Sequence, residues 1–131
     1  MRGVDTNILV RYLVEDDEGQ AARVQRFLTA SRFSDEPVFV SCIALCETVW
    51  VLQTVHGFRK LEALSQIGNV LETDIFRIEE EGAVRRALKA AREGRGDFAD
   101  YLMGQLNLDR GCRVTVTFDR ALRSDPAFSV L

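Results

Sequence analysis

The stretch Val4-Asp5-Thr6-Asn7-Ile8-Leu9 places a carboxylate between two apolar runs near the start of the chain. The run before it, Met1 to Val4, predicts a short strand, and the run after it, Ile8 to Val14, predicts a helix. An Asp at such a junction is a good N-cap, because its side chain accepts a hydrogen bond from an unpaired N–H group of the first helical turn. Carboxylates recur in comparable settings further along the chain, and that recurrence is the functional signal.

Short apolar runs and helical segments continue to alternate after this stretch. Strands are predicted near residues 1–4, 37–40, 74–78 and 112–117, with a last short strand over 128–131, and the segments between them have helical spacing. This alternation predicts an α/β fold with a mainly parallel sheet that is covered on both faces. A chain of 131 residues is most naturally one domain, here 1–131.

Composition narrows the class of protein. Apolar residues at 47% and charged residues at 28% are typical of globular chains. No run is long enough to span a membrane and no signal peptide precedes the first strand, which predicts a cytoplasmic protein without membrane partners. The net charge of −3 argues against a surface that coats nucleic acid in general, but not against a local basic patch. Three cysteines and one histidine complete neither a disulfide framework nor a zinc site.

Glu47 and Asp100 are the next informative acids. Glu47 stands in the middle of an apolar segment, 43–52, that predicts a buried helix, so its carboxylate is expected to be buried and to need a partner. Asp97 follows a glycine turn and is expected to cap the next helix. Asp100 lies three residues further on, which lets both side chains face the same way.

Asp119 directly follows the strand predicted over 113–117, as Asp5 follows the first strand. In parallel α/β sheets, ligands bind beyond the carboxyl ends of the strands. We therefore expect four acids to meet at that edge: Asp5, Glu47, Asp100 and Asp119.

Four carboxylates in one place need a compensating charge. Two unit charges 4 Å apart repel by about 4 kcal/mol at an effective dielectric of 20. Mg²⁺ or Mn²⁺ offsets that repulsion, because these hard cations prefer oxygen ligands. With no His or Cys suited to catalysis, the pattern favours metal-assisted hydrolysis of a phosphodiester. Nearby hydroxyl and amide groups are candidates to orient the carboxylates or a water molecule: Thr6, Asn7, Ser41 and Thr117.

Four pieces of the sequence carry a resemblance to a known family. They are Val-Asp-Thr-Asn-Ile-Leu-Val-Arg-Tyr-Leu at 4–13, Ala-Leu-Cys-Glu-Thr-Val-Trp-Val-Leu around Glu47, Asp-Phe-Ala-Asp-Tyr-Leu at 97–102, and Val-Thr-Phe-Asp-Arg-Ala-Leu at 116–122. Each piece is weak alone. In their order and spacing they resemble the PIN-domain ribonucleases, and within these the VapC-type toxins of toxin–antitoxin pairs, over essentially the whole chain.

The resemblance implies a three-layer α/β/α sandwich with a mainly parallel central sheet that cuts RNA with Mg²⁺ or Mn²⁺. It implies that Asp5, Glu47, Asp100 and Asp119 form the family's acidic quartet, with Asp5 and Asp100 as direct metal ligands and Asp97 in a helping or capping role. It also implies a homodimer and a cognate antitoxin whose tail plugs the active site. The chain departs from many relatives at Tyr101-Leu102-Met103-Gly104-Gln105, where they carry smaller residues, and this puts the local packing in question.

Other interpretations stay open beside this one. A PIN-fold binding module without activity fits the same sequence. A phospho-receiver domain fits less well, because adjacent acids after the first strand and a Lys after the last are missing. A haloacid-dehalogenase-like phosphatase requires an Asp where Asn7 stands. Four arginines of the predicted helix over 79–93 and the turn after it either contact RNA phosphates or form a solvated face: Arg85, Arg86, Arg92 and Arg95.

Overall fold

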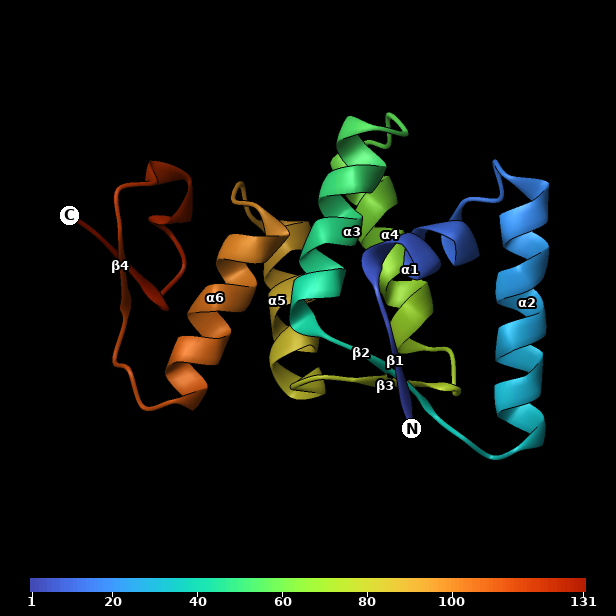
Figure 1. Cartoon of the computed structure of the whole chain (residues 1–131). Coiled ribbons are helices and arrows are strands. Elements are labelled where there is room, and N and C mark those ends of the chain that lie inside the picture. The colour runs from blue at the N-terminus through green and yellow to red at the C-terminus, as the bar shows by residue number, and fades with distance from the viewer. The chain divides into compact units, whose positions relative to one another are not determined.

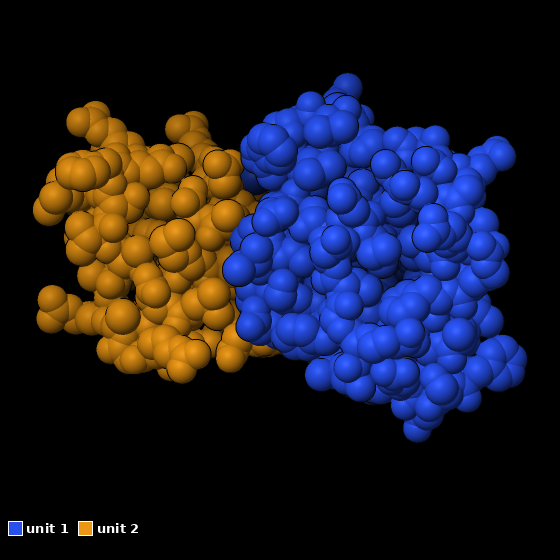
Figure 2. Space-filling model, viewed as in Figure 1, with its two compact units in different colours: residues 1–79 blue, residues 80–131 orange.

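A computed structural model describes all residues, 1–131. The contacts within the chain divide it into two compact units, Met1–Glu79 and Glu80–Leu131, which Figure 2 distinguishes by colour. We call them unit 1 and unit 2 and describe each by itself. Compact units also occur inside single domains, so the prediction of one domain over 1–131 stays a prediction.

Unit 1 contains a three-stranded parallel sheet and four helices (Figure 1). In chain order its elements are β1 (Arg2–Val4), α1 (Thr6–Leu13), α2 (Glu18–Phe33), β2 (Val38–Val40), α3 (Cys42–Thr54), α4 (Lys60–Leu71) and β3 (Phe76–Ile78). The strand order is β1-β2-β3, with β2 in the centre. Val38 and Val40 of this central strand have no exposed surface, which is the burial expected of an apolar run in a parallel sheet.

The helices of unit 1 pack against one another as well as on the sheet. Helix α1 contacts both α2 and α3, and α3 contacts α4. Their facing sides are fully buried Leu and Ile residues, among them Leu9, Leu45, Leu52, Leu64 and Ile67. Burying such a side chain contributes about 1.5 to 3 kcal/mol, so this face holds the helices in place.

Side-chain caps set the starts of three helices in unit 1. Asp5 accepts a hydrogen bond from the Ile8 N–H, 3.1 Å from Oδ1, which confirms the predicted N-cap of α1. Asp17 caps α2 and Ser41 caps α3 in the same way. Each cap satisfies an N–H group that has no partner inside the helix.

Unit 2 pairs two helices with a small two-stranded sheet (Figure 1). Its elements are α5 (Glu81–Glu93), α6 (Phe98–Asp109), β4 (Thr115–Thr117), a short 3₁₀ helix η1 (Arg120–Leu122) and β5 (Phe128–Val130). Helix α5 packs along α6 through small residues, and its buried face includes Ala83, Ala87 and Ala91. Strands β4 and β5 run parallel, with Thr117 opposite Val130.

The predicted strands and helices are all present, and the α/β class with parallel strands is confirmed. The five strands are divided between two sheets, one in each unit, rather than forming the one central sheet that the sequence predicts. The 3₁₀ helix η1 has no counterpart among the predicted elements, since three residues are too short for a periodic signal. None of the helices combines the length and hydrophobicity that a membrane-spanning segment requires.

Candidate active site

The carboxyl ends of the three strands in unit 1 lie in register. Val4 is paired with Val40, and Val40 with Ile78, so the residues that follow the strands stand at the same edge of the sheet. These residues are Asp5, Ser41 and Glu79. The Glu79 carboxylate accepts a hydrogen bond from the Cys42 N–H at 2.8 Å, which adds a negative charge at the start of α3. Glu79 thus has a helix-capping role that the sequence did not predict.

Glu47 lies next to Thr6 in unit 1, because α1 and α3 are packed against each other. The Thr6 hydroxyl donates a hydrogen bond to Glu47 Oε2 at 3.0 Å. This bond joins the first turn of α1, which Asp5 caps, to the middle of α3. Two residues 41 positions apart in the chain are therefore brought together, a predicted site acid and a candidate supporting hydroxyl.

The prediction that Glu47 is buried is wrong, because its side chain is exposed. Ile43 and Trp50, which share a face of α3 with it, are 70% and 63% exposed. Residues spaced by three or four positions lie on one side of a helix, and here that side is not covered. An apolar composition shows that a helix is hydrophobic all round, but it does not show which sides are covered.

The Glu47→Ala variant is expected to keep the stability of the parent to within about 0.5 kcal/mol, as exposed substitutions usually do. The contrasting variant is Leu45→Ala on the same helix, whose side chain has no exposed surface. It is expected to lose about 2 to 5 kcal/mol, because it leaves a cavity. Thermal unfolding of both variants measures the difference, and a large loss in Glu47→Ala would show that its carboxylate is part of the structural support of α3.

Unit 2 brings together Asp97, Asp100 and Asp119, since the pKa of the Asp100 carboxyl responds to both of the others. Asp97 occupies the N-cap position of α6 but its side chain makes no capping hydrogen bond, so the predicted cap is wrong in that respect. Asp119 follows β4, and its Oδ1 accepts the Ala121 N–H at 2.9 Å, which starts η1. The Thr117 hydroxyl in turn accepts the Asp119 N–H at 3.0 Å, and so helps to fix its backbone.

The environment of Asp100 favours the neutral form of its carboxyl. Burial is the largest cause of its raised pKa, followed by the negative charges of Asp97 and Asp119. A backbone hydrogen bond from Asp97 acts in the opposite direction, but it does not reverse the shift. No cation is among the causes, so the charges that act on the Asp100 carboxyl are the two negative ones.

The donor set of unit 2 fits a hard divalent cation. Asp97 and Asp119 both act on the Asp100 carboxyl, and carboxylate oxygens are the ligands that Mg²⁺ and Mn²⁺ prefer. Within either unit, no three His, Cys, Asp or Glu side chains form a ready-made cation site. The set of four acids, Asp5, Glu47, Asp100 and Asp119, therefore stays a prediction, with Thr6 bonded to Glu47 and Thr117 bonded to Asp119.

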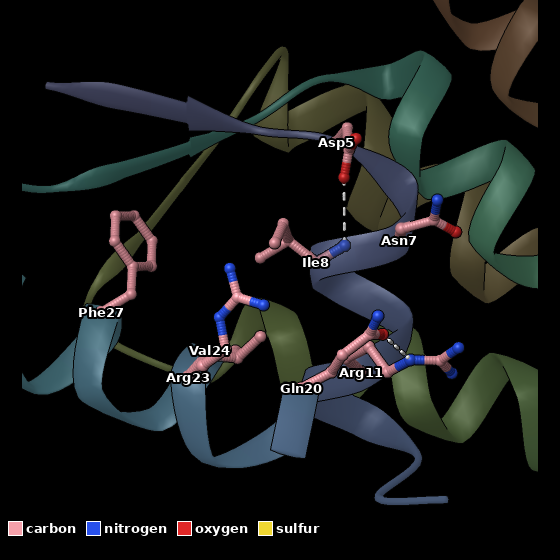
Figure 3. A pocket seen from close by; sticks show the side chains of 8 residues that line it. All are labelled: Asp5, Asn7, Ile8, Arg11, Gln20, Arg23, Val24 and Phe27. Carbon is pink, nitrogen blue, oxygen red and sulfur yellow. Dashed lines mark hydrogen bonds between the residues drawn. The ribbon is translucent and has the colours of Figure 1, made fainter. Parts of the chain in front are cut away.

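Asp5 and Asn7 line a cavity of about 510 Å³ in unit 1, between α1 and α2 (Figure 3). The wall combines apolar and polar side chains: Asp5, Asn7, Ile8, Arg11, Gln20, Arg23, Val24 and Phe27. Arg11 is held in place, because its Nε donates to Gln20 Oε1 at 2.6 Å and its Nη1 to Asp16 at 2.8 Å. Ser41, the fourth candidate for a supporting role, uses its hydroxyl to cap α3.

Tyr101 supports the turn before Asp97. Its contacts show how the large residue directly after Asp100 is packed. Its side chain is buried, and its hydroxyl accepts a hydrogen bond from the Gly96 N–H at 3.1 Å. A Cβ atom at Gly94 would collide with the Tyr101 side chain, and one at Gly96 would lie in tight contact with its ring. The two glycines therefore make room for the large side chain that follows the third acid.

The Tyr101→Phe variant is expected to lose about 1 to 3 kcal/mol, because the buried Gly96 N–H is left without an acceptor. Tyr12→Phe is the matched control, since its hydroxyl makes only a long contact of 3.4 Å with Thr73. Chemical denaturation of the two variants measures both losses. Equal losses would mean that the Tyr101 hydroxyl has no special part in holding the turn.

The fold and the site define a class: an α/β protein with parallel strands that has acidic residues at the carboxyl ends of its strands and in the first turns of its helices. The model of the PIN domain family matches residues 4–124. The chain belongs to the PIN domain family, and the match includes parts of both units.

The relatives agree with the predicted subfamily. The chain is 22% identical over 123 residues to a VapC ribonuclease of Aquifex aeolicus (strain VF5), which covers 94% of this chain and 90% of that protein. A solved structure, VapC20 of Mycobacterium tuberculosis, is described as a sarcin-ricin loop cleaving toxin. It is 18% identical and covers 90% of this chain and 88% of its own, with a TM-score of 0.44. The predicted resemblance to VapC-type PIN ribonucleases is confirmed by the family match and by the curated relative.

Proposed function

We propose that this chain is a metal-dependent endoribonuclease that hydrolyses RNA phosphodiester bonds, and that it acts as the toxin of a VapBC-type pair. The observation that carries the proposal is the group of Asp97, Asp100 and Asp119, in which the charges of the other two act on the Asp100 carboxyl. The family match and the name of the curated relative support a nuclease over other roles for such a group.

Hydrolysis requires water to add to the phosphorus atom, the bond from phosphorus to one ribose oxygen to break, and a proton to reach that oxygen. A divalent cation, Mg²⁺ or Mn²⁺, supplies Lewis-acid stabilisation of the charge that develops on the phosphate. Asp5, Glu47, Asp100 and Asp119 are the residues that we propose to hold it, with Asp5 and Asp100 as direct ligands. Thr6 orients the Glu47 carboxylate through its hydrogen bond, and Thr117 holds the backbone of Asp119.

Partners and location follow from the same assignment. We propose that the protein works in the cytoplasm as a homodimer and that a cognate antitoxin protein blocks its active site. Light scattering of the purified protein, alone and with a candidate antitoxin, measures both states. The alternative is a PIN-fold binding module without activity, which all four acids and the raised pKa of Asp100 make the weaker choice.

The experiment that tests the function is incubation of the full chain, freed of antitoxin, with total bacterial RNA in Mg²⁺, in Mn²⁺ and in EDTA. Sequencing of the cut ends then names the substrate. We expect cuts at a few sites that depend on the metal and are absent in Asp5→Asn. A folded protein that cuts no RNA with either metal would overturn the nuclease proposal and favour the binding module.

A further inference from the structure

A second surface of unit 2 is hollowed and strongly basic. The hollow has a volume of about 510 Å³ and is lined by Arg95, Arg120, Ala121, Arg123 and Ser124. We call it the arginine hollow. Arg95 comes from the turn before α6, whereas the other lining residues belong to η1 and the residues just after it.

Packing of small residues brings these two segments together. Gly96 lies so close to Leu122 that a Cβ atom there would collide with the leucine side chain. Leu122, the last residue of η1, is buried, and the Gly96 N–H donates a hydrogen bond to the Tyr101 hydroxyl. The backbone beside each arginine is therefore fixed, while the long side chains extend from the surface.

The three guanidinium groups of the arginine hollow have no partner. Two arginines of α5 are paired instead: Arg85 with Glu81 at 3.2 Å, and Arg86 with both oxygens of Asp109 at 2.8 Å. Asp119 and Asp125, which flank η1, accept backbone N–H groups at 2.9 and 2.8 Å and form no ion pair with these arginines. A concentration of unpaired positive charge on a chain of net charge −3 calls for an external anion.

We propose that the arginine hollow binds backbone phosphates of single-stranded RNA beside the bond that is cut. The planar fork of Arg matches the oxygens of a phosphate group. Arg120 directly follows Asp119, so RNA held there runs past a residue of the proposed acidic site. This inference rests on the proposed function, and it adds which surface holds the substrate.

An exposed aromatic side chain two residues before Arg120 favours single-stranded RNA over a free phosphate ion. Phe118 stands between Thr117 and Asp119 and is 80% exposed. Single-stranded nucleic acids are held by basic grooves together with aromatic side chains on which bases stack. Three guanidinium groups in one hollow also exceed what a single phosphate ion needs.

The test measures binding separately from cleavage. Full-length Asp100→Asn protein in EDTA is titrated into fluorescent single-stranded RNA, duplex RNA of the same sequence and inorganic phosphate, at several salt concentrations. The test variant, called the hollow variant, carries Arg95→Ala, Arg120→Ala and Arg123→Ala in addition to Asp100→Asn. The charge-matched control adds Arg26→Ala, Arg110→Ala and Arg113→Ala, three exposed arginines outside the hollow.

We expect the hollow variant to bind single-stranded RNA at least about 10-fold more weakly, and the control to bind like the Asp100→Asn parent. The slope of log K against log salt is expected to fall by about 2, because three phosphate contacts on a single strand contribute about 0.7 each. Adding Phe118→Ala to the Asp100→Asn parent is expected to weaken the binding of single-stranded RNA more than the binding of duplex RNA.

Equal losses in the hollow variant and the control would overturn the inference, since they would reflect net charge alone. Tighter binding of duplex RNA or of inorganic phosphate than of single-stranded RNA would overturn it as well. If the parent binds RNA through the hollow but the wild-type chain cuts none, the hollow stands and the nuclease proposal fails. If the wild-type chain cuts RNA while the hollow variant binds RNA normally, the nuclease proposal stands and the inference about the arginine hollow fails.

Discussion

The Asp100→Asn variant is expected to cut RNA at least about 100-fold more slowly than the parent, because it removes a charged oxygen ligand from the proposed cation site. The amide keeps the size of the side chain and an oxygen that can accept the Asp97 backbone hydrogen bond. The loss is therefore expected in activity and not in folding. Cleavage of the RNA found in the first assay, measured on protein with a normal circular dichroism spectrum, tests it.

The same substitution is expected to raise stability at neutral pH in metal-free buffer. The pKa of Asp100 is raised above its ordinary value of 3.8, so the folded state binds this proton more tightly than the unfolded state. Its contribution to stability is fully present below pH 3.8 and is lost as the pH rises through the raised pKa. The gain in Tm from Asp100→Asn should thus be present at pH 7 and vanish below pH 3.8.

Asp125→Asn is the matched control in unit 2. Its Oδ1 accepts the Ala127 N–H at 2.8 Å, a bond that an amide oxygen preserves, and it has no place in the proposed site. It should keep full activity and show no comparable pH-dependent gain in Tm. Retained cleavage in folded Asp100→Asn would falsify the assignment of Asp100 as a ligand.

The Asp5→Asn variant is the second change with a large expected effect, again a fall of at least about 100-fold in cleavage rate. Asp5 both caps α1 and stands at the carboxyl end of β1. Asn is as good an N-cap as Asp, so the variant keeps the hydrogen bond to Ile8 and loses only the charge. Its Tm is expected to stay close to that of the parent.

The Asp17→Asn variant separates two roles of a carboxylate at the start of a helix, capping the helix and taking part in the chemistry. Asp17 caps α2 by accepting the Gln20 N–H at 3.0 Å, the geometry that Asp5 has at α1, but it does not follow a strand. Equal activity in Asp17→Asn and the parent, beside an inactive Asp5→Asn, would assign the charge of Asp5 to chemistry. If Asp5→Asn is as active as Asp17→Asn, Asp5 is a cap and nothing more.

Local signals in the sequence predicted the elements of this protein well. The junction at Asp5 is a strand end, a cap and a helix start within a few residues, and each of these depends on neighbours in the chain. The end of β4, which is followed by Asp119 and η1, likewise depends on residues that are neighbours in the chain. The hydrogen bond between Thr6 and Glu47 was not predicted, because it joins two helices far apart in sequence.

The sequence by itself thus determined the α/β class, the order of strands and helices, and the acids at their junctions, since periodicity and capping are short-range. Only the tertiary structure decided that Glu47 is exposed, that Tyr101 fits against two glycines, and that Arg95 shares a hollow with Arg120 and Arg123. Burial and charge compensation depend on which distant segments pack together. A single sequence read for local patterns does not contain that information.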